Sequence, residues 1–355
     1  MTSNQELKNI ISLFDYENKN DYKYKIDGIK KMNNETYTTI ISGVNKKDNS
    51  DFINIRAIDI NSKKPKEVDY LGQILKFINI LGSLTNQTYF PNSKILLSKN
   101  QEYLFIYNKG NNIPLYYLIY SQKTDYLNNK ELIRWIVFQI SAGLYILHSN
   151  NIIHHDLKTS NILINEEGGV LINGFDSSIL KGEKSISYTL SYSSPELLIN
   201  LEADEKIDLW DLGILMLELF CKKHKILENE KIKTRDEYIR YVLSYFGNNE
   251  KYSIDDLKRL LKENKDIKFT LNKEILNAID DKDAIDLISN LLVFNPNKRY
   301  SAKEVLESNY LKEFKGYSLE IKPLENPIDY KEISKGSIDH TRFIDLINKL
   351  IKQKI

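Results

Sequence analysis

Residues 154–161 read His-His-Asp-Leu-Lys-Thr-Ser-Asn, and the interpretation of the whole sequence depends on this segment. A helical stretch that ends near His148 leads through Asn151-Ile152-Ile153 into it. The run Asn161-Ile162-Leu163-Ile164 follows as a predicted strand, because it is short and apolar. A lone His-x-Asp is more often a turn than a functional site. Its meaning therefore depends on motifs that come later in the chain.

Three further motifs follow in order. Residues 189–196 read Thr-Leu-Ser-Tyr-Ser-Ser-Pro-Glu, residues 208–213 read Asp-Leu-Trp-Asp-Leu-Gly, and residues 295–299 read Asn-Pro-Asn-Lys-Arg. With residues 154–161 they make the sequence resemble eukaryotic-type serine/threonine protein kinase domains from about Tyr24 to Phe314. Four motifs in the family's order and at family-like spacing exceed what chance would supply.

The resemblance implies roles for individual residues. Phosphoryl transfer to a hydroxyl needs a base beside the attacking oxygen, cations on the phosphates and metal ligands. It implies Asp156 as the catalytic base, Lys158 as the lysine on the transferred phosphate, and Asn161 as a ligand of magnesium. Thr189 is implied as a further catalytic residue. Residues implied to be structural are His154, which would pack under Phe175, Asp208, and the ion pair of Glu196 with Arg299.

The residues implied to hold the nucleotide depart from the family pattern. The segment Lys30–Tyr37 has no glycine where the family has a glycine-rich loop, so side chains would keep its amides away from phosphate oxygens. Tyr37 replaces a valine and Asn54 an alanine beside the adenine, with Leu163 as a further pocket residue. Arg56 replaces the lysine that contacts the phosphates, and this exchange is not conservative.

Two partner positions have also changed. By position, Gln73 stands where the family has the glutamate that pairs with that lysine, so the pair would become arginine with an amide. His155 replaces the arginine that, in many relatives, binds a phosphate on the activation segment. A neutral imidazole would bind this phosphate poorly.

The metal-binding motif of the family is inverted. Residues 174–176 read Gly-Phe-Asp instead of Asp-Phe-Gly, so Gly174 offers no carboxylate. In an extended segment Asp176 would point to the same face but lie roughly 6–7 Å along the chain. Two interpretations stay open, in which Asp176 is an ordinary loop residue or a displaced magnesium ligand.

The closest subgroup is predicted to be the mitogen-activated and cyclin-dependent kinases, on the basis of residues 291–296 and a returning tail. Ser193 departs from this subgroup, which has an arginine there, and Lys184-Ser185-Ile186 stands where a Thr-x-Tyr phosphorylation motif is expected. The hydroxyl-rich activation segment, residues 174–196, is interpreted as a solvated loop, with a regulatory phosphosite as the alternative.

The expected fold class is α+β, with the two lobes of a protein kinase. Residues 1–21 are treated as an extension with at most a short helix. A small N-lobe, about 22–108, would hold a sheet and one helix near 66–81, beginning at Pro65 and ending at Gly82. The C-lobe, about 113–314, would be mainly helical. Its helices are predicted at 129–149, 204–220, 235–246, 254–263, 283–292 and 302–308, and a tail at 315–355 ends in an amphipathic helix.

Composition limits the functional classes. The 355 residues contain 50 Lys and Arg against 49 Asp and Glu, so no basic field favours nucleic acid or membranes. A single cysteine, Cys221, suits a reducing compartment. The apolar stretch Leu132–Leu147 includes Arg134 and Gln139 and is expected to fall short of a membrane span. We expect an intracellular protein, cytoplasmic or nuclear, whose partner or substrate is a protein.

Three functional hypotheses remain. The first is a pseudokinase, a binding or allosteric module with little or no phosphoryl transfer, since the losses cluster on nucleotide and metal contacts. The second is an active serine/threonine kinase that uses ATP and Mg²⁺, with Asp156 as base and a displaced Asp176 as metal ligand. The third is another transferase chemistry on the same scaffold. The implied cofactors are ATP and Mg²⁺ for an active enzyme, or none.

Overall fold

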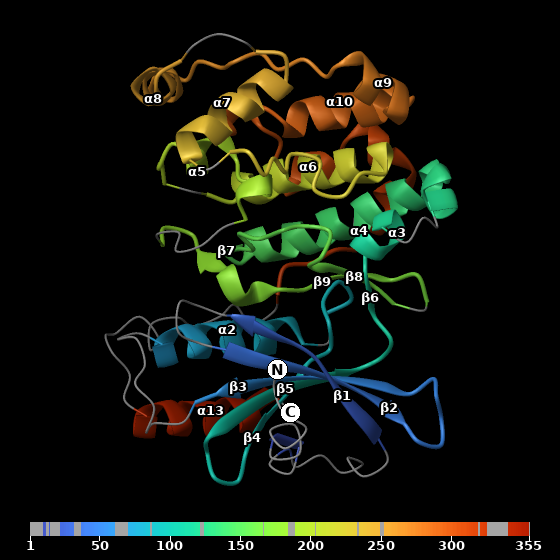
Figure 1. Ribbon diagram of the computed structural model, residues 1–355, viewed down its shortest axis with the longest axis vertical. Coiled ribbons are helices and arrows are strands. Elements are labelled where there is room, and N and C mark those ends of the chain that lie inside the picture. Colours follow the sequence, from blue (N-terminus) through green and yellow to red (C-terminus); the bar gives the residue numbers. More distant parts are fainter. Residues whose placement is uncertain are drawn as a thin grey trace. The chain divides into compact units, whose positions relative to one another are not determined.

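The computed structural model of the chain forms two compact units. Unit 1 is Met1–Asn112 with Asn165–Glu167 and Glu325–Ile355, and unit 2 is Ile113–Ile164 with Gly168–Leu324 (Figure 1). The described residues are 10–11, 14, 22–31, 37–60, 70–85, 87–120, 124–165, 167–183, 189–202, 204–232, 234–248, 252–318, 320–324 and 340–354.

A five-stranded antiparallel sheet is the centre of unit 1, with strand order β1-β2-β3-β5-β4. Its strands are β1 (Tyr22–Lys31), β2 (Tyr37–Asn45), β3 (Phe52–Asp59), β4 (Lys94–Leu97) and β5 (Tyr103–Lys109). Successive side chains of a strand point to opposite faces. In β3, Ile53, Ile55 and Ala57 are buried in one core cluster. Asn54 and Arg56 therefore lie on the other face of the sheet.

The first core cluster also includes residues from the N-terminal extension. Ile10 and Phe14 are buried in it. The Phe14 ring packs edge-on against Phe105 and Tyr107, with ring centroids 5.1 and 5.3 Å apart. Ile10 lies in a helical segment, as predicted, and most of the remaining extension lies outside the described residues. Part of the extension is thus a component of the core of unit 1.

Helix α2 (Tyr70–Leu84) is the helix that the sequence predicted beside the sheet. Its predicted start at Pro65 lies outside the described residues. The predicted end at Gly82 is wrong, because the helix continues to Leu84, a buried side chain. Burial of one more apolar residue outweighs the helix-breaking tendency of a single glycine, which is worth about 1 kcal/mol.

Helix α13 (His340–Lys354) also belongs to unit 1, where it packs against α2 and β4 (Figure 1). Three residues of its predicted apolar stripe, Phe343, Ile344 and Ile347, are buried. The prediction that the terminal amphipathic helix packs on another element is confirmed for this part of the stripe.

Unit 2 is mainly helical. Its α-helices are α3 (Tyr116–Tyr120), α4 (Lys130–Ser149), α5 (Pro195–Leu198), α6 (Lys206–Cys221), α7 (Arg235–Tyr245), α8 (Ile254–Lys262), α9 (Lys273–Ile279), α10 (Lys282–Leu291), α11 (Ala302–Leu306) and α12 (Lys315–Ser318). Its short strands are β6 (Ile113–Pro114), β7 (Ile152–Ile153), β8 (Ile162–Ile164), β9 (Val170–Ile172) and β10 (Ile179–Leu180). Its 3₁₀ turns are η2 (Thr124–Asn128), η3 (Phe175–Ser177), η4 (Leu190–Tyr192), η5 (Pro296–Lys298) and η6 (Asn309–Phe314). The sequence missed four helices of unit 2, α3, α5, α9 and α12, each of seven residues or fewer.

Local capping signals explain where several of these helices begin. The Asn129 side chain accepts hydrogen bonds from the first backbone amides of α4. A capping box of Thr234 with Glu237 begins α7. Equivalent boxes begin α8 (Ser253 with Asp256) and α11 (Ser301 with Glu304). Helix α6 is buried along almost its whole length, and α4, α9 and α10 pack against it.

Helix α4 is long and apolar enough to cross a bilayer by length and composition. The expectation that Arg134 and Gln139 would bring it below this limit was therefore wrong. However, 67% of its apolar window is buried inside the protein, as in a core helix of a globular domain.

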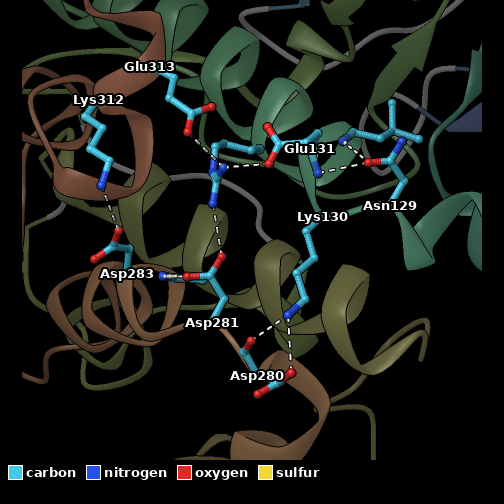
Figure 2. Close-up of polar contacts among 11 residues, drawn as sticks. Asn129, Lys130, Glu131, Asp280, Asp281, Asp283, Lys312 and Glu313 are labelled. Atoms are coloured by element: carbon cyan, nitrogen blue, oxygen red, sulfur yellow. Dashed lines mark hydrogen bonds and ion pairs between the residues drawn. The ribbon is translucent and has the colours of Figure 1, made fainter.

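A cluster of charged residues joins the start of α4 to α10 and η6 (Figure 2). The Arg134 guanidinium lies 3.1 Å from Asp281, 2.8 Å from Glu131 and 3.6 Å from Glu313, and it stacks over the Tyr310 ring. The Arg134 and Asp281 side chains are each only 13% exposed. Two more exposed pairs flank them, Lys130–Asp280 and Lys312–Asp283. Arg134 therefore links three segments that are far apart in the sequence.

Substituting Phe343 should destabilise unit 1. Phe343→Ala removes a fully buried ring from the packed side of α13, and we expect a loss of about 3–5 kcal/mol in the free energy of unfolding. Urea denaturation of the full chain measures this loss. Lys349→Ala, on the exposed side of the same helix, is the matched control and should change stability by less than about 0.5 kcal/mol. Equal effects of the two substitutions would contradict the packing described for α13.

Removing Arg134 should leave a half-buried carboxylate without its cation. For Arg134→Ala we expect a loss of about 2–4 kcal/mol, since the Asp281 side chain keeps its charge at a largely buried position. Lys130→Ala removes a cation from the exposed pair with Asp280 and should cost under about 1 kcal/mol. Thermal denaturation of both variants compares the two, and a larger loss for Lys130→Ala would show that the cluster is not centred on Arg134.

Candidate functional site

A buried carboxylate holds the backbone of the segment 154–161. Asp208, at the start of α6, accepts hydrogen bonds from the amides of His154 (2.9 Å) and His155 (2.8 Å), and lies 2.8 Å from His148 Nε2. Burial alone would raise the pKa of Asp208, but the hydrogen bonds from His148 and the amides outweigh it and keep this pKa below its ordinary value. His155 has a left-handed backbone, φ +68°, which is uncommon for a residue other than glycine.

Four residues that the resemblance implies to be catalytic or metal-binding form one cluster. Three are in the loop, and the fourth is Thr189. Lys158 Nζ lies 2.9 and 2.7 Å from the two carboxylate oxygens of Asp156. Thr189 Oγ1 donates to Asp156 Oδ1 at 2.5 Å and accepts from Lys158 at 2.8 Å. Asn161 Nδ2 donates to Asp156 Oδ2 at 2.9 Å and to its backbone oxygen at 2.8 Å. The Asp156 carboxylate is thus held in one orientation next to a cation, as a general base requires.

His154 lies beneath the inverted motif. Its ring packs edge-on against Phe175 at 5.1 Å. Nδ1 accepts a hydrogen bond from the Asp156 amide, and Nε2 lies 2.9 Å from the backbone oxygen of Asn173. Burial lowers the pKa of His154, which fits a neutral ring that donates from Nε2. The sequence predicted the contact with Phe175 but not the one with Asn173.

Glu196 and Arg299 meet in a buried, two-pronged ion pair. Arg299 Nη1 and Nη2 donate to the two Glu196 oxygens at 2.8 and 3.0 Å. The guanidinium also donates to the backbone oxygen of Val293 and stacks over the Trp210 ring at 5.3 Å. Its donors are thereby largely satisfied, which a buried charge requires. The pair ties the end of the activation segment to η5.

The activation segment lies only in part within the residues that the structure describes. Ser193, which stands where the subgroup has an arginine, donates its hydroxyl to the Thr189 backbone oxygen at 3.0 Å. The residues Lys184-Ser185-Ile186, where a phosphorylation motif was expected, lie outside the described residues.

Gly174 has no room for a side chain. A Cβ atom at this position would lie 2.5 Å from Asn161 Cγ and 2.6 Å from its Oδ1. The backbone is left-handed, with φ +86°, and a 3₁₀ turn (η3) follows directly. The assumption of an extended segment was therefore wrong, and so was the argument that placed Asp176 on the same face as residue 174.

The residues around Gly174 do not fit the expected magnesium site. Mg²⁺ needs oxygen ligands at about 2.1 Å in near-octahedral geometry. Position 174 supplies no side-chain oxygen, and the Asn161 amide lies where a side chain at this position would begin. Asp176 lies within η3 with Oδ1 buried, and its role as a ligand stays a prediction.

In unit 1, Asn54 binds the segment at the end of β5. Its Nδ2 donates to the backbone oxygen of Gly110 at 3.0 Å and lies 3.4 Å from Asn108 Oδ1. The resemblance places a small alanine at this position, beside the adenine. An amide that is tied to the chain here occupies volume which the family leaves to the ligand.

Arg56 contacts α2 through an aromatic ring. Its guanidinium lies 5.0 Å from the centroid of Phe77, a cation–π distance. Phe77 is four residues after Gln73, so the two share one face of the helix. The sequence pointed to Gln73 and missed Phe77, although this spacing could have suggested it.

Two other predicted pocket residues are placed by backbone pairing. Tyr37 begins β2 and pairs with Lys31, while residues 32–36 of the expected phosphate loop lie outside the described residues. Leu163 lies in β8, between Pro114 and Leu171, and is half-buried. Their roles toward a nucleotide stay predictions.

Sequence reasoning missed a buried polar network near the loop. The Tyr192 hydroxyl donates to Glu218 Oε2 at 2.5 Å, and the Thr159 hydroxyl donates to the same oxygen at 3.1 Å. His224 Nδ1 lies 3.2 Å from the Thr159 hydroxyl. Burial raises the pKa of Tyr192 well above its ordinary value, and Glu218 adds to this effect. The signal was Glu218 itself, a charged residue in an apolar helical run, which must find buried partners.

Comparisons with known proteins agree with these geometries. A profile of the protein kinase domain family matches residues 29–311. The chain is similar to cyclin-dependent kinase G-1 of Oryza sativa subsp. indica, with 28% identity over 67% of this chain and 36% of that protein. Serine/threonine-protein kinase ppk23 of Schizosaccharomyces pombe is 25% identical over 88% of this chain and 76% of that protein. Mitogen-activated protein kinase HOG1 of Candida albicans is 27% identical over 67% and 63%. The chain thus spans about a third of the first relative and just under two thirds of the third.

Gly174→Asp should destabilise unit 2 rather than complete a metal site. The new Cβ would overlap the Asn161 amide and adopt a left-handed backbone, and we expect a loss of about 2–4 kcal/mol. Gly182→Asp is the matched control, since Gly182 also has a positive φ (+92°) but no atom within 4 Å of an added Cβ. That control should lose only about 1 kcal/mol. Denaturation curves that coincide for the two variants would rule out the steric role given to Asn161.

Proposed function

The chain belongs to the protein kinase domain family, and we propose that it is a pseudokinase, a binding or allosteric module with little or no phosphoryl transfer. The observation that carries this proposal is the steric relation of Gly174 to Asn161. The position that would supply a carboxylate to magnesium has no side chain, and the Asn161 amide closes the space where one would lie. Without that ligand the charge on the phosphates loses its main counter-charge.

Two contacts of unit 1 also support the proposal, because they would weaken the binding of a nucleotide. The Asn54 amide is tied to the Gly110 backbone oxygen in the place of a small alanine. The Arg56 guanidinium stacks on Phe77, so part of its charge is directed to α2. Since a planar guanidinium does not replace a compact ammonium without loss, phosphate contacts at this position would weaken.

The interactions that stabilise unit 2 are intact, which supports a role that uses the fold without the chemistry. Asp208 holds the loop, and Glu196 pairs with Arg299. A fold can keep its surfaces after its reaction is lost. The name of one relative, a cyclin-dependent kinase, indicates that this relative depends on a protein partner. We propose that this chain also binds a protein partner. An intracellular location is part of the proposal and rests on the single cysteine and the family.

One observation favours the alternative, an active serine/threonine kinase. Asp156, Lys158, Thr189 and Asn161 are assembled with hydrogen bonds of 2.5–2.9 Å. In this alternative Asp156 is the base toward a protein hydroxyl, and ATP and Mg²⁺ are the co-substrate and metal. Asp176 would then have to move to reach the metal.

A thermal-shift titration tests nucleotide binding. A ligand that binds the native state increases the free energy of unfolding by mass action, by about 2.7 kcal/mol when its concentration is a hundred times Kd. This stabilisation raises the melting temperature. We expect no saturable rise with ATP and Mg²⁺ at millimolar concentration. The control is ATP with EDTA, which separates metal-dependent binding from nonspecific effects. A saturable rise that requires Mg²⁺ would refute the nucleotide part of the proposal.

A phosphorylation assay tests catalysis separately. Radiolabelled phosphate transfer from ATP to a generic protein substrate is compared for the parent chain and Asp156→Asn, which keeps the size of the side chain but not its basicity. We expect equal, background incorporation for both. Incorporation by the parent that falls at least about tenfold in Asp156→Asn would establish the active alternative, since removal of a general base costs this much or more.

A further inference from the structure

Exposed aromatic side chains gather on one short stretch of unit 2. Tyr117, Tyr120 and Tyr126 leave 46%, 73% and 58% of their surface exposed. Among the described residues only two other large apolar side chains are as exposed, Ile113 in the same stretch and Tyr317 elsewhere. Isolated exposed apolar residues are ordinary, but a group of them marks an interaction surface.

A lysine-rich loop contacts the same stretch of unit 2 through Tyr116 and Asn128. The residues after α6 read Lys222-Lys223-His224-Lys225. The His224 ring stacks on Tyr116 at 5.5 Å, and Tyr116 stacks on Tyr117 at 4.4 Å. Lys222 Nζ donates to Asn128 Oδ1, at the end of η2. The loop, α3 and η2 therefore form one aromatic-basic surface, defined by Tyr117, Tyr120, Tyr126, Lys222 and Lys223.

Two positive charges of this surface are not neutralised within the described part of the chain. Lys225 pairs with Glu228 at 2.7 Å. Lys222 meets only a neutral amide, and Lys223 has no ion pair with a described residue. Both lysines are exposed, and both lie within two residues of His224, whose ring stacks on Tyr116. The surface thus offers cations and flat apolar faces together.

The aromatic-basic surface is connected to the loop at 154–161. The Tyr116 amide donates to the Thr159 backbone oxygen at 3.2 Å, and the Leu115 amide donates to that of Ile162 at 2.7 Å. His224 also reaches the Thr159 hydroxyl. A chain bound on this surface would lie next to the loop that carries Asp156 and Lys158.

We propose that the aromatic-basic surface binds an acidic peptide segment of a partner protein. Its carboxylates would meet Lys222 and Lys223, and its apolar or proline side chains would lie on the faces of Tyr117 and Tyr120. A nucleic acid fits less well, because the chain has a net charge of only +1 and no wider basic field. The inference names the partner chemistry for the binding role proposed above and rests on that role.

Fluorescence anisotropy with the full chain tests this inference. The probe is a short labelled peptide of alternating glutamate and proline, compared with the same peptide carrying glutamine for glutamate. We expect binding of the acidic peptide only, weakened by salt. The reversed-charge variant Lys222→Glu/Lys223→Glu should lower the affinity at least about tenfold, since opposite charges become like charges. Tyr117→Ala/Tyr120→Ala should lower it about tenfold through lost apolar contact.

Matched controls use exposed residues far from the surface. Lys262→Glu/Lys268→Glu makes the same charge change at α8 and after it, and Tyr317→Ala removes another exposed tyrosine. Figure 1 shows α8 and α3 at opposite sides of unit 2. These controls should change the affinity less than about twofold. If one double variant does not fold, the affinity of the other double variant for the acidic peptide still tests the inference.

Several outcomes would overturn the inference: no binding of the acidic peptide, equal binding by the glutamine peptide, or equal loss in the controls. Tighter binding of a labelled oligouridylate at the same surface would replace it with a nucleic-acid site. Nucleotide binding is measured independently by thermal shift. Failure of the pseudokinase proposal would therefore be distinguished from failure of this surface.

Discussion

The contact on which the rest of unit 2 depends is the Asp208 carboxylate at the start of buried helix α6. It accepts hydrogen bonds from two consecutive amides of the loop and lies beside His148, and these bonds compensate the cost of burying a charge. The left-handed backbone of His155 is acceptable because both its amide and that of His154 are fixed. Asp156 then projects toward Lys158 with little freedom. The geometry of the loop is thus set by an interaction that takes no part in chemistry.

This separation would allow a site to keep its arrangement even if its catalytic function were lost. The Asp156 cluster depends on α6 and on Thr189, and neither contact requires a nucleotide or a metal. In the proposed pseudokinase, the departures at Gly174 and Asn54 affect contacts that a ligand would make, so they cost the fold little. At Gly174 the missing side chain even allows closer packing by Asn161. Stability and catalysis are therefore under different constraints in this chain.

The sequence predicted contacts that depend on motif and spacing. Glu196 and Arg299, about a hundred residues apart, meet as the resemblance implied, because each is recognised by its own motif. Contacts chosen by tertiary packing could not be predicted. Phe14 is one of several apolar residues in the N-terminal extension, and nothing local shows that it joins the sheet. The same holds for Phe77 below Arg56, since helix spacing limits the candidates but does not select the partner. The turn at Gly174 was missed because an extended chain was assumed without turn signals.

The discontinuity of unit 1 has a consequence for the order in which the protein can be made. Its sheet and α2 leave the ribosome before unit 2, but α13, whose buried Phe343 and Ile347 complete unit 1, is synthesised after unit 2. Unit 2 lies between them in the sequence and can form around α6 first. Since chains usually fold domain by domain from the N-terminus, this protein would have to keep unit 1 unfinished until α13 has been synthesised. During that interval, the apolar surface that α13 covers is available to chaperones.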